Sequence, residues 1–206
     1  MKLLAATRSA GKQREFRRVL EPAGLEVVFP GDVGLHPTGA EDALELGLSF
    51  EANARRKAEH FARLSGLPTV ADDSGLEVLS LGGAPGVRSR RWAGATGSEA
   101  EVDAANNAEL VRRLAGATGP RRAARYRCVL VYLSDPGAVP AVFEGSCGGR
   151  ILDAPRGEGG FGYDPYFESE QLGKTFGEAS AQEKDAVSHR GRALRALVQA
   201  LVGSSA

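Results

Sequence analysis

Two adjacent carboxylates stand at the end of an apolar segment near the middle of the chain, in Ala71-Asp72-Asp73-Ser74-Gly75. Side chains alternate between the faces of a strand, so Asp72 and Asp73 are expected to point in opposite directions, and only one can readily be the working group. A carboxylate beside a glycine can bind Mg²⁺ or take a proton from water. Asp, Ser and Gly are also common turn residues, and these five residues alone favour a strand-ending turn.

A second polar segment, Thr7-Arg8-Ser9-Ala10-Gly11-Lys12, joins a predicted strand to a predicted helix. It contains hydroxyl groups and no acid, and the N-terminus of a helix favours an anion such as phosphate. It is not a P-loop, because Ala6 and Gln13 stand where that motif needs Gly and Ser or Thr. A phosphate site and an ordinary strand-loop-helix connection both fit this segment.

Lysine is scarce in a chain that otherwise uses arginine, and a lysine can mark a site that needs a compact charge. The lysines are Lys2, Lys12, Lys57, Lys174 and Lys184. Lys57 lies one turn after Asn53 on a helix that Ser49 is predicted to cap. The helical spacing alone favours a solvated face for Asn53 and Lys57.

A glycine-rich loop at 157–165 contains Phe161, Gly162, Tyr163 and Asp164. Its formal G-x-G-x-x-G is followed by Tyr-Asp-Pro where a dinucleotide-binding fold needs a helix, which excludes that fold. The loop is either a common glycine-aromatic turn or one in which Phe161 stacks on a flat base and Asp164 hydrogen-bonds to it. Further along, Lys184, His189 and Arg190 bring hydrogen-bond donors to the start of the last helix.

These groups must be positioned by strands and helices that alternate along the chain. Hydrophobic patterning predicts strands at 2–6, 25–29, 69–72, 75–81, 121–133 and 139–146, and helices at 11–20, 49–64, 98–116 and from about 184 onward. The short turn at 134–137 makes its two strands antiparallel, so the sheet should be mixed. The helix at 98–116 is expected to be purely structural. We therefore expect one α/β domain over residues 1–206, with helices flanking a mixed sheet.

Composition excludes several classes of protein. The chain has 206 residues, and its 26 basic and 26 acidic residues cancel, so no global field draws in nucleic acid or an anionic membrane. No apolar run approaches the roughly 20 residues that cross a bilayer, and the apolar start is too short for a signal peptide. A soluble, cytoplasmic protein is expected. Cys128 and Cys147 form no C-x-x-C pair and are expected to be ordinary core residues.

Five separated segments, in this order, resemble one family: T-R-S-A-G-K, E-x-G-x-S-F-x-x-N-A, A-D-D-S-G-L, G-G-F-G-Y-D-P and E-K-x-x-x-S-H-R-G. The sequence is similar to the inosine/xanthosine triphosphate pyrophosphatases, which clear deaminated purine nucleotides. The resemblance implies a mixed-sheet fold of two lobes around a central cleft, usually a homodimer. It also implies Mg²⁺-dependent hydrolysis of ITP, dITP or XTP to the monophosphate and pyrophosphate.

Carried over by position, the resemblance gives roles to particular residues. Glu45 and Asp73 would hold the metal and activate water, with Asp72 in support. The phosphate and sugar side would comprise Thr7, Arg8, Ser9, Ala10, Gly11, Lys12, Lys57 and Ser74. The base pocket would comprise Phe161, Gly162, Tyr163, Asp164, Lys184, His189 and Arg190. The family usually has Asn at the position of Ser9, so the side chain that would contact the triphosphate is shorter here.

Two other functions fit parts of this pattern. A pyrophosphatase of the Maf-like type would act on other bases, and a panel of substrates separates it. A nucleotide sensor would bind without turnover, but a binder of triphosphate gains little from Glu45, Asp72 and Asp73 unless a metal is present. The sequence alone leaves the preference among ITP, dITP and XTP open.

Overall fold

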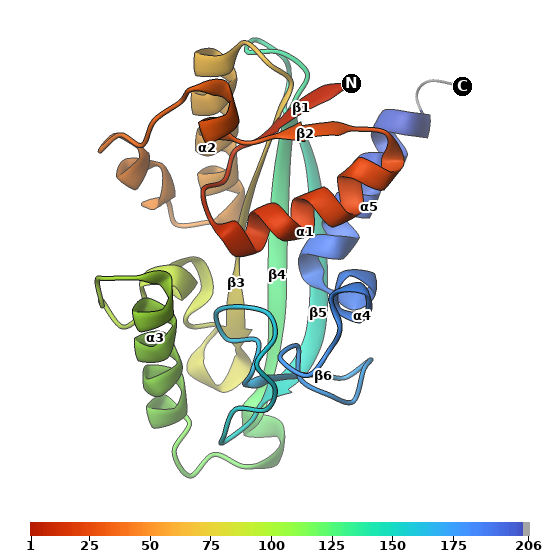
Figure 1. Cartoon of the computed structure of the whole chain (residues 1–206). Helices are drawn as coiled ribbons and strands as arrows, with labels where there is room; N and C mark the ends of the chain where they lie inside the picture. The colour runs from red at the N-terminus through yellow and green to blue at the C-terminus, as the bar shows by residue number, and fades with distance from the viewer. Residues whose placement is uncertain (204–206) are drawn as a thin grey trace. The chain divides into compact units, whose positions relative to one another are not determined.

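The computed structural model describes residues 1–203, apart from the side chain of Asp42. Six strands form one hydrogen-bonded sheet in the order β2-β1-β3-β4-β5-β6. The strands are β1 (Lys2–Ala5), β2 (Glu26–Val28), β3 (Thr69–Val78), β4 (Ala123–Leu133), β5 (Ala141–Ile151) and β6 (Phe167–Ser169). The α-helices are α1 (Ala10–Leu20), α2 (Phe50–Ser65), α3 (Glu99–Arg113), α4 (Ala181–Val187) and α5 (His189–Gly203) (Figure 1).

The sheet is mixed, as the sequence predicted. β1 pairs in parallel with β2 and with β3, with Leu4 opposite Val28 on one side and Thr69 on the other. β5 pairs antiparallel with β6, and Gly149 lies opposite Ser169. The short strand β6 was not predicted, because three residues are too few to show a pattern.

The chain divides into two compact units, and the long strands contribute to both. The first unit comprises Met1–Asp73, Cys128–Gly145 and the chain from Arg190 onward, and the second comprises Ser74–Arg127 and Ser146–His189.

Helices cover both faces of the first unit's part of the sheet. Leu3 and Val70 pack with α1 and α5 in one buried cluster, whereas Leu4 and Ala71 pack with α2 in another. Successive residues of a strand face opposite sides, so the sheet separates these two clusters. Helix α2 begins where the sequence indicated, because Ser49 Oγ accepts the N–H of Ala52 at its start.

The second unit has its own core. Leu76 of β3, Leu110 of α3, Tyr126 of β4 and Ile151 of β5 are buried there in one apolar cluster, together with Phe167 of β6. The predicted capping boxes are present at Ser98 and Ser180, each with a glutamate three residues later. Cys128 and Cys147 are buried free thiols, as predicted.

One prediction of local structure is wrong. The favoured turn at Asp72-Asp73-Ser74-Gly75 is absent, and β3 runs without interruption through all four residues. Gly75 is not among the glycines with positive φ, so the backbone stays extended there. The carboxylates remain in the strand because groups from other elements meet them on both faces.

Within residues 1–203, no helix is both long enough and apolar enough to span a membrane.

Candidate active site

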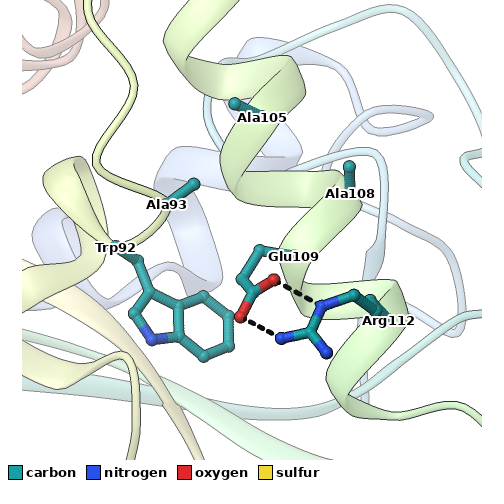
Figure 2. A pocket seen from close by; sticks show the side chains of 6 residues that line it. All are labelled: Trp92, Ala93, Ala105, Ala108, Glu109 and Arg112. Carbon is teal, nitrogen blue, oxygen red and sulfur yellow. Dashed lines mark hydrogen bonds and ion pairs between the residues drawn. The ribbon is translucent and has the colours of Figure 1, made fainter.

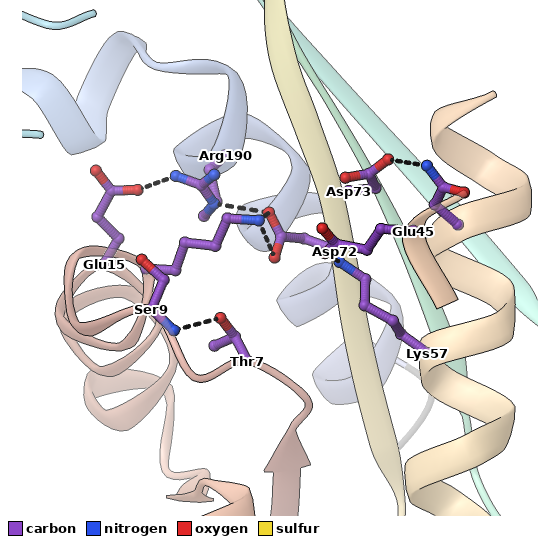
Figure 3. Close-up of polar contacts among 10 residues, drawn as sticks. Thr7, Ser9, Glu15, Glu45, Lys57, Asp72, Asp73 and Arg190 are labelled. Carbon is purple, nitrogen blue, oxygen red and sulfur yellow. Dashed lines mark hydrogen bonds and ion pairs between the residues drawn. The ribbon is translucent and has the colours of Figure 1, made fainter. Parts of the chain in front are cut away.

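β3 presents its two adjacent aspartates to different helices of the first unit. Asp72 lies on the same face of the strand as Val70, toward α1 and α5. Asp73 lies on the same face as Ala71, toward α2. Both residues are buried. The predicted opposite orientation is confirmed, and it gives each carboxylate its own set of partners (Figure 3).

Asp72 is the centre of a buried ion-pair network. Lys12 Nζ lies 3.0 Å from its Oδ1 and 2.9 Å from its Oδ2, and Arg190 Nε donates to Oδ2 at 3.1 Å. The guanidinium of Arg190 also pairs with Glu15 of α1. Burial alone would raise the pKa of Asp72, but the positive charges of Lys12, Arg190 and Lys57 outweigh it and lower the pKa far below its usual range. Asp72 is therefore a fixed anion that ties α1 and α5 to β3.

Asp73 has a different environment. Its Oδ2 accepts a hydrogen bond of 2.8 Å from Asn53 Nδ2, and its other oxygen has no hydrogen-bond partner within the part of the chain that the structure describes. Burial raises the pKa of Asp73, although Lys57 and Lys12 oppose that shift. A buried carboxylate with a raised pKa and an open oxygen can bind a cation or take a proton.

Glu45 ends a 3₁₀ helix (Glu41–Glu45) and pairs with Lys57 of α2, whose Nζ lies 2.7 Å from Glu45 Oε1. The nearby charge of Lys57 lowers the pKa of Glu45 to about 2. Burial alone would lower the pKa of Lys57, but the negative charges of Glu45, Asp73 and Asp72 outweigh it and raise the pKa above its usual range. Both groups are thus ionised at neutral pH.

The predicted solvated face of α2 is wrong. Asn53 is 0% exposed and Lys57 only 7% exposed. Their polar ends are buried because Asp73 and Glu45 supply hydrogen-bonding and charged partners, which offset the cost of removing an amide and an ammonium from water.

The first loop leads into α1, with Ser9 at the N-cap and Ala10 and Gly11 beginning the helix. Ser9 makes no side-chain cap, and Thr7 Oγ1 accepts the Ser9 N–H at 3.3 Å. The helix has no acid in its first turn, which suits an anion at its N-terminus. Arg8 does not join this group, because its guanidinium makes two hydrogen bonds of 2.7 Å to Glu41.

Glu45 and Asp73 supply carboxylate oxygens, the donor type that Mg²⁺ prefers. No cluster of three or more His, Cys, Asp or Glu ligands occurs among the described residues. Mg²⁺ needs only one or two protein carboxylates when substrate phosphates complete its coordination.

The second unit holds the glycine-aromatic loop. Asp164 accepts hydrogen bonds of 2.8 Å from the Phe161 N–H and 2.5 Å from Lys184 Nζ, and it also interacts with Tyr126 Oη at 3.3 Å. The ammonium of Lys184 lies 4.6 Å from the centroid of the Phe161 ring. These contacts give Asp164 and Lys184 a role in holding the loop. A direct contact of either residue with a base stays a prediction.

Two other residues predicted in the base pocket are also held by the second unit. The ring of His189 stacks on Tyr126, with centroids 4.6 Å apart and planes 8° apart. Tyr163 Oη donates to the Ser89 carbonyl at 2.8 Å, and burial raises the pKa of this phenol. Arg190 was predicted with Lys184 and His189, but its guanidinium is engaged by Glu15 and Asp72 in the first unit.

Helix α3 has a structural role, as predicted, and it holds the glycine-aromatic loop. Asp103 accepts the Gly162 N–H at 2.8 Å, and Asn107 Nδ2 donates to the Gly162 carbonyl at 2.9 Å. Asp103 and Asn107 are one turn apart, so one face of the helix holds both the N–H and the carbonyl of Gly162, which belong to the peptide units before and after it. The i, i+4 spacing of two polar residues was visible in the sequence, but nothing there indicated which segment they would contact.

A separate hollow in the second unit contains none of the predicted residues. Its lining comprises Trp92, Ala93, Ala105, Ala108, Glu109 and Arg112. Glu109, the acid in this lining, makes two hydrogen bonds of 2.7 Å to Arg112 and is therefore neutralised (Figure 2). Ser74, the remaining predicted contact residue, is half-buried on β3 directly after Asp73.

The chain is similar to known proteins over nearly its whole length. The chain is 49% identical over 203 residues to a dITP/XTP pyrophosphatase of Ralstonia nicotianae, covering 97% of this chain and 96% of the relative. It is 45% identical over 203 residues to a dITP/XTP pyrophosphatase of Shigella flexneri, covering 97% and 98% of the two chains. The structure matches that of a HAM1 protein from Coxiella burnetii with a TM-score of 0.84 at 33% identity, covering 98% and 99% of the two chains.

A crystal structure of a nucleoside-triphosphatase / dITP/XTP pyrophosphatase from Mycobacterium abscessus matches with a TM-score of 0.72 at 43% identity, covering 96% of this chain and 98% of the other. Residues 3–200 match the Ham1 family. These findings confirm the resemblance that the five sequence segments indicated, and this chain belongs to the Ham1 family.

Proposed function

We propose that this chain hydrolyses ITP, dITP and XTP to the monophosphate and pyrophosphate, and so removes non-standard purine nucleotides. The observation that carries the proposal is that the two adjacent aspartates of β3 have different environments. Asp72 is a permanently charged anchor for Lys12 and Arg190, and its neighbour Asp73 keeps one carboxylate oxygen open beside Glu45.

In the proposed mechanism, the first unit binds the phosphate chain. The first turn of α1 offers backbone N–H groups, and Lys12 and Lys57 supply positive charge that is already oriented by Asp72 and Glu45. Asp73 accepts a proton from the attacking water, because its raised pKa brings its basicity closer to neutral pH.

Glu45 and Asp73 would hold Mg²⁺, which when bound would neutralise phosphate charge and lower the pKa of water. A cation is needed there because a triphosphate carries up to about four negative charges, which the carboxylates of Glu45 and Asp73 would repel.

Base selection is assigned to the glycine-aromatic loop of the second unit. Phe161 would stack on the purine, and Lys184 or His189 would donate a hydrogen bond to the 6-keto oxygen. Adenine carries an amino group there and cannot accept that bond, which gives discrimination. Guanine has the same oxygen, so its exclusion must depend on contacts at position 2.

The experiment is a pyrophosphate-release assay with ITP, dITP, XTP, GTP, ATP and dUTP in the presence of Mg²⁺. The proposal expects turnover of the first three, with GTP, ATP and dUTP poor. Binding of ITP without release of pyrophosphate would indicate a sensor, and a preference for dUTP or another base would indicate a different pyrophosphatase.

We propose a homodimer in the cytoplasm, acting without nucleic acid or membrane partners. Light scattering on the purified chain tests the oligomeric state, and a monomer at micromolar concentration would contradict the homodimer without affecting the assignment of the reaction.

A further inference from the structure

One buried side chain connects Asp73 to the segment that follows Glu45. Asn53 of α2 donates from Nδ2 to Asp73 Oδ2 at 2.8 Å, and its Oδ1 accepts the Gly47 N–H at 2.7 Å. Gly47 follows Glu45 by two residues. Asn53 therefore joins the strand that carries Asp73 to the segment that carries Glu45.

The close approach explains why residue 47 is glycine. A Cβ built on Gly47 would lie 2.4 Å from Asn53 Oδ1, well inside van der Waals contact, and 3.4 Å from Asn53 Cγ. Gly47 is not among the glycines with positive φ, so its backbone would accept other residues. Space for Asn53, and not backbone conformation, requires glycine here.

Before Gly47 the segment is held by Leu44, which packs against the buried cluster of α2, and by the ion pair of Glu45 with Lys57. Leu46 is 66% exposed and Leu48 is 98% exposed, so neither anchors it by apolar packing. Glu45 and Asp73 carry like charges and would repel each other without a restraint. Lys57, one turn after Asn53 on the same rigid helix, pairs with Glu45.

We propose that Asn53 is a positioning residue that sets the separation of the Glu45 and Asp73 carboxylates for a divalent cation, and that Gly47 is glycine to allow it. Asn53 acts through the Asp73 carboxylate and the Gly47 amide. Its hydrogen bond occupies one oxygen of Asp73 and directs the other toward the proposed cation. This inference rests on the proposed function, because it assumes that Glu45 and Asp73 are the metal ligands.

The test uses two variants that break the same link from opposite sides. Gly47→Ala introduces the clash with Asn53. Asn53→Ser shortens the side chain, which then no longer bridges Asp73 and Gly47. Gly39→Ala is the matched control, because Gly39 precedes Glu45 in the same connection, has no positive φ and has open space around its Cβ position. Each chain is titrated with Mn²⁺ and the free ion is followed by electron paramagnetic resonance, and the thermal midpoint is measured in parallel.

Loss of a residue that orients a metal ligand typically costs 10- to 100-fold in metal affinity. We expect Gly47→Ala and Asn53→Ser each to weaken Mn²⁺ binding by about that factor, with the double variant no weaker than either single one. Gly39→Ala should bind as the wild type does. Unchanged Mn²⁺ affinity in a folded Gly47→Ala or Asn53→Ser chain would overturn the inference.

The same titration separates this inference from the proposed function. A wild-type chain that releases pyrophosphate from ITP but binds no Mn²⁺ would overturn the positioning role and leave the reaction in place. A chain that binds Mn²⁺ with the expected weakening in the variants, but hydrolyses none of the nucleotides, would support the positioning role and contradict the proposed reaction.

Discussion

Asp72→Asn should lower the stability of the fold, whereas Asp73→Asn should lower activity and leave stability unchanged or higher, although they are the same substitution at adjacent positions. Asp72 is surrounded by Lys12 and Arg190, and its pKa is held far below the usual range. Asp73 accepts one hydrogen bond from Asn53, and burial raises its pKa. The Asp72 charge therefore stabilises the folded state, whereas the Asp73 charge is less favourable in the fold than in water.

The magnitudes follow from these contacts. Removing one partner of a buried ion pair costs about 3 to 5 kcal/mol because a buried charge is left uncompensated. Arg190 would keep Glu15, which puts Asp72→Asn near the lower end, about 3 kcal/mol. In a chain of this size that lowers the thermal midpoint by roughly 6 to 12 °C. Asp73→Asn should leave the midpoint unchanged or higher, while kcat falls by about 10² to 10⁴-fold as a general base is lost.

The pH dependence adds a check with a definite sign. A carboxyl group whose pKa is lowered by folding contributes stability above its unfolded pKa, and that contribution disappears as the pH falls toward the folded value. The difference in thermal midpoint between wild type and Asp72→Asn should therefore be largest near neutral pH. It should shrink below the ordinary pKa of aspartate, about 4.

Thermal unfolding and ITP turnover at saturating Mg²⁺ are measured on both variants. A larger loss of stability for Asp73→Asn than for Asp72→Asn would refute the assignment of their charges. Near wild-type kcat in Asp73→Asn would place the proton acceptor elsewhere, and Asp72 or Glu45 would then be the candidates.

Regular patterns in the sequence predicted much of the fold and part of the site. The two-residue period of a strand was enough to place Asp72 and Asp73 on opposite faces, because it depends only on backbone geometry. Capping boxes at Ser98 and Ser180 located helix starts for a similarly local reason.

Errors arose where distant partners outweigh local preference. Asp, Ser and Gly favour a turn, yet Asp72 stays in a strand because Lys12, 60 residues earlier, and Arg190, 118 residues later, meet its carboxylate. Asn53 and Lys57 resemble an ordinary polar helix face until the carboxylates that bury them are placed opposite. Pairings of this kind leave no periodic signal, so sequence reasoning could name the residues without finding their contacts.

Three further predictions concern phosphate binding, proton transfer and base selection. Lys12→Ala should weaken binding of a non-hydrolysable triphosphate analogue much more than binding of the monophosphate, because the Lys12 charge contacts the phosphate tail. Calorimetric titrations measure both affinities, and equal weakening would place Lys12 elsewhere. In the metal-free chain the pKa of Asp73, followed by NMR titration, should lie above the ordinary value for aspartate because burial raises it, and a pKa at or below that value would contradict the assignment. The last prediction separates base reading from phosphate binding. Lys184 is buried, pairs with Asp164 and lies over the Phe161 ring, so its removal should impair base recognition by the aromatic loop and leave the phosphate-binding groups of the first unit in place. Loss of one buried hydrogen bond costs about 1 to 3 kcal/mol, so Lys184→Ala should lower kcat/KM for ITP by roughly 5- to 160-fold and barely change the poor rate with ATP. Both substrates are measured on a variant whose circular dichroism matches the wild type, and an equal fall for ITP and ATP would mean that Lys184 supports structure or phosphate binding and that base selection is made by other residues.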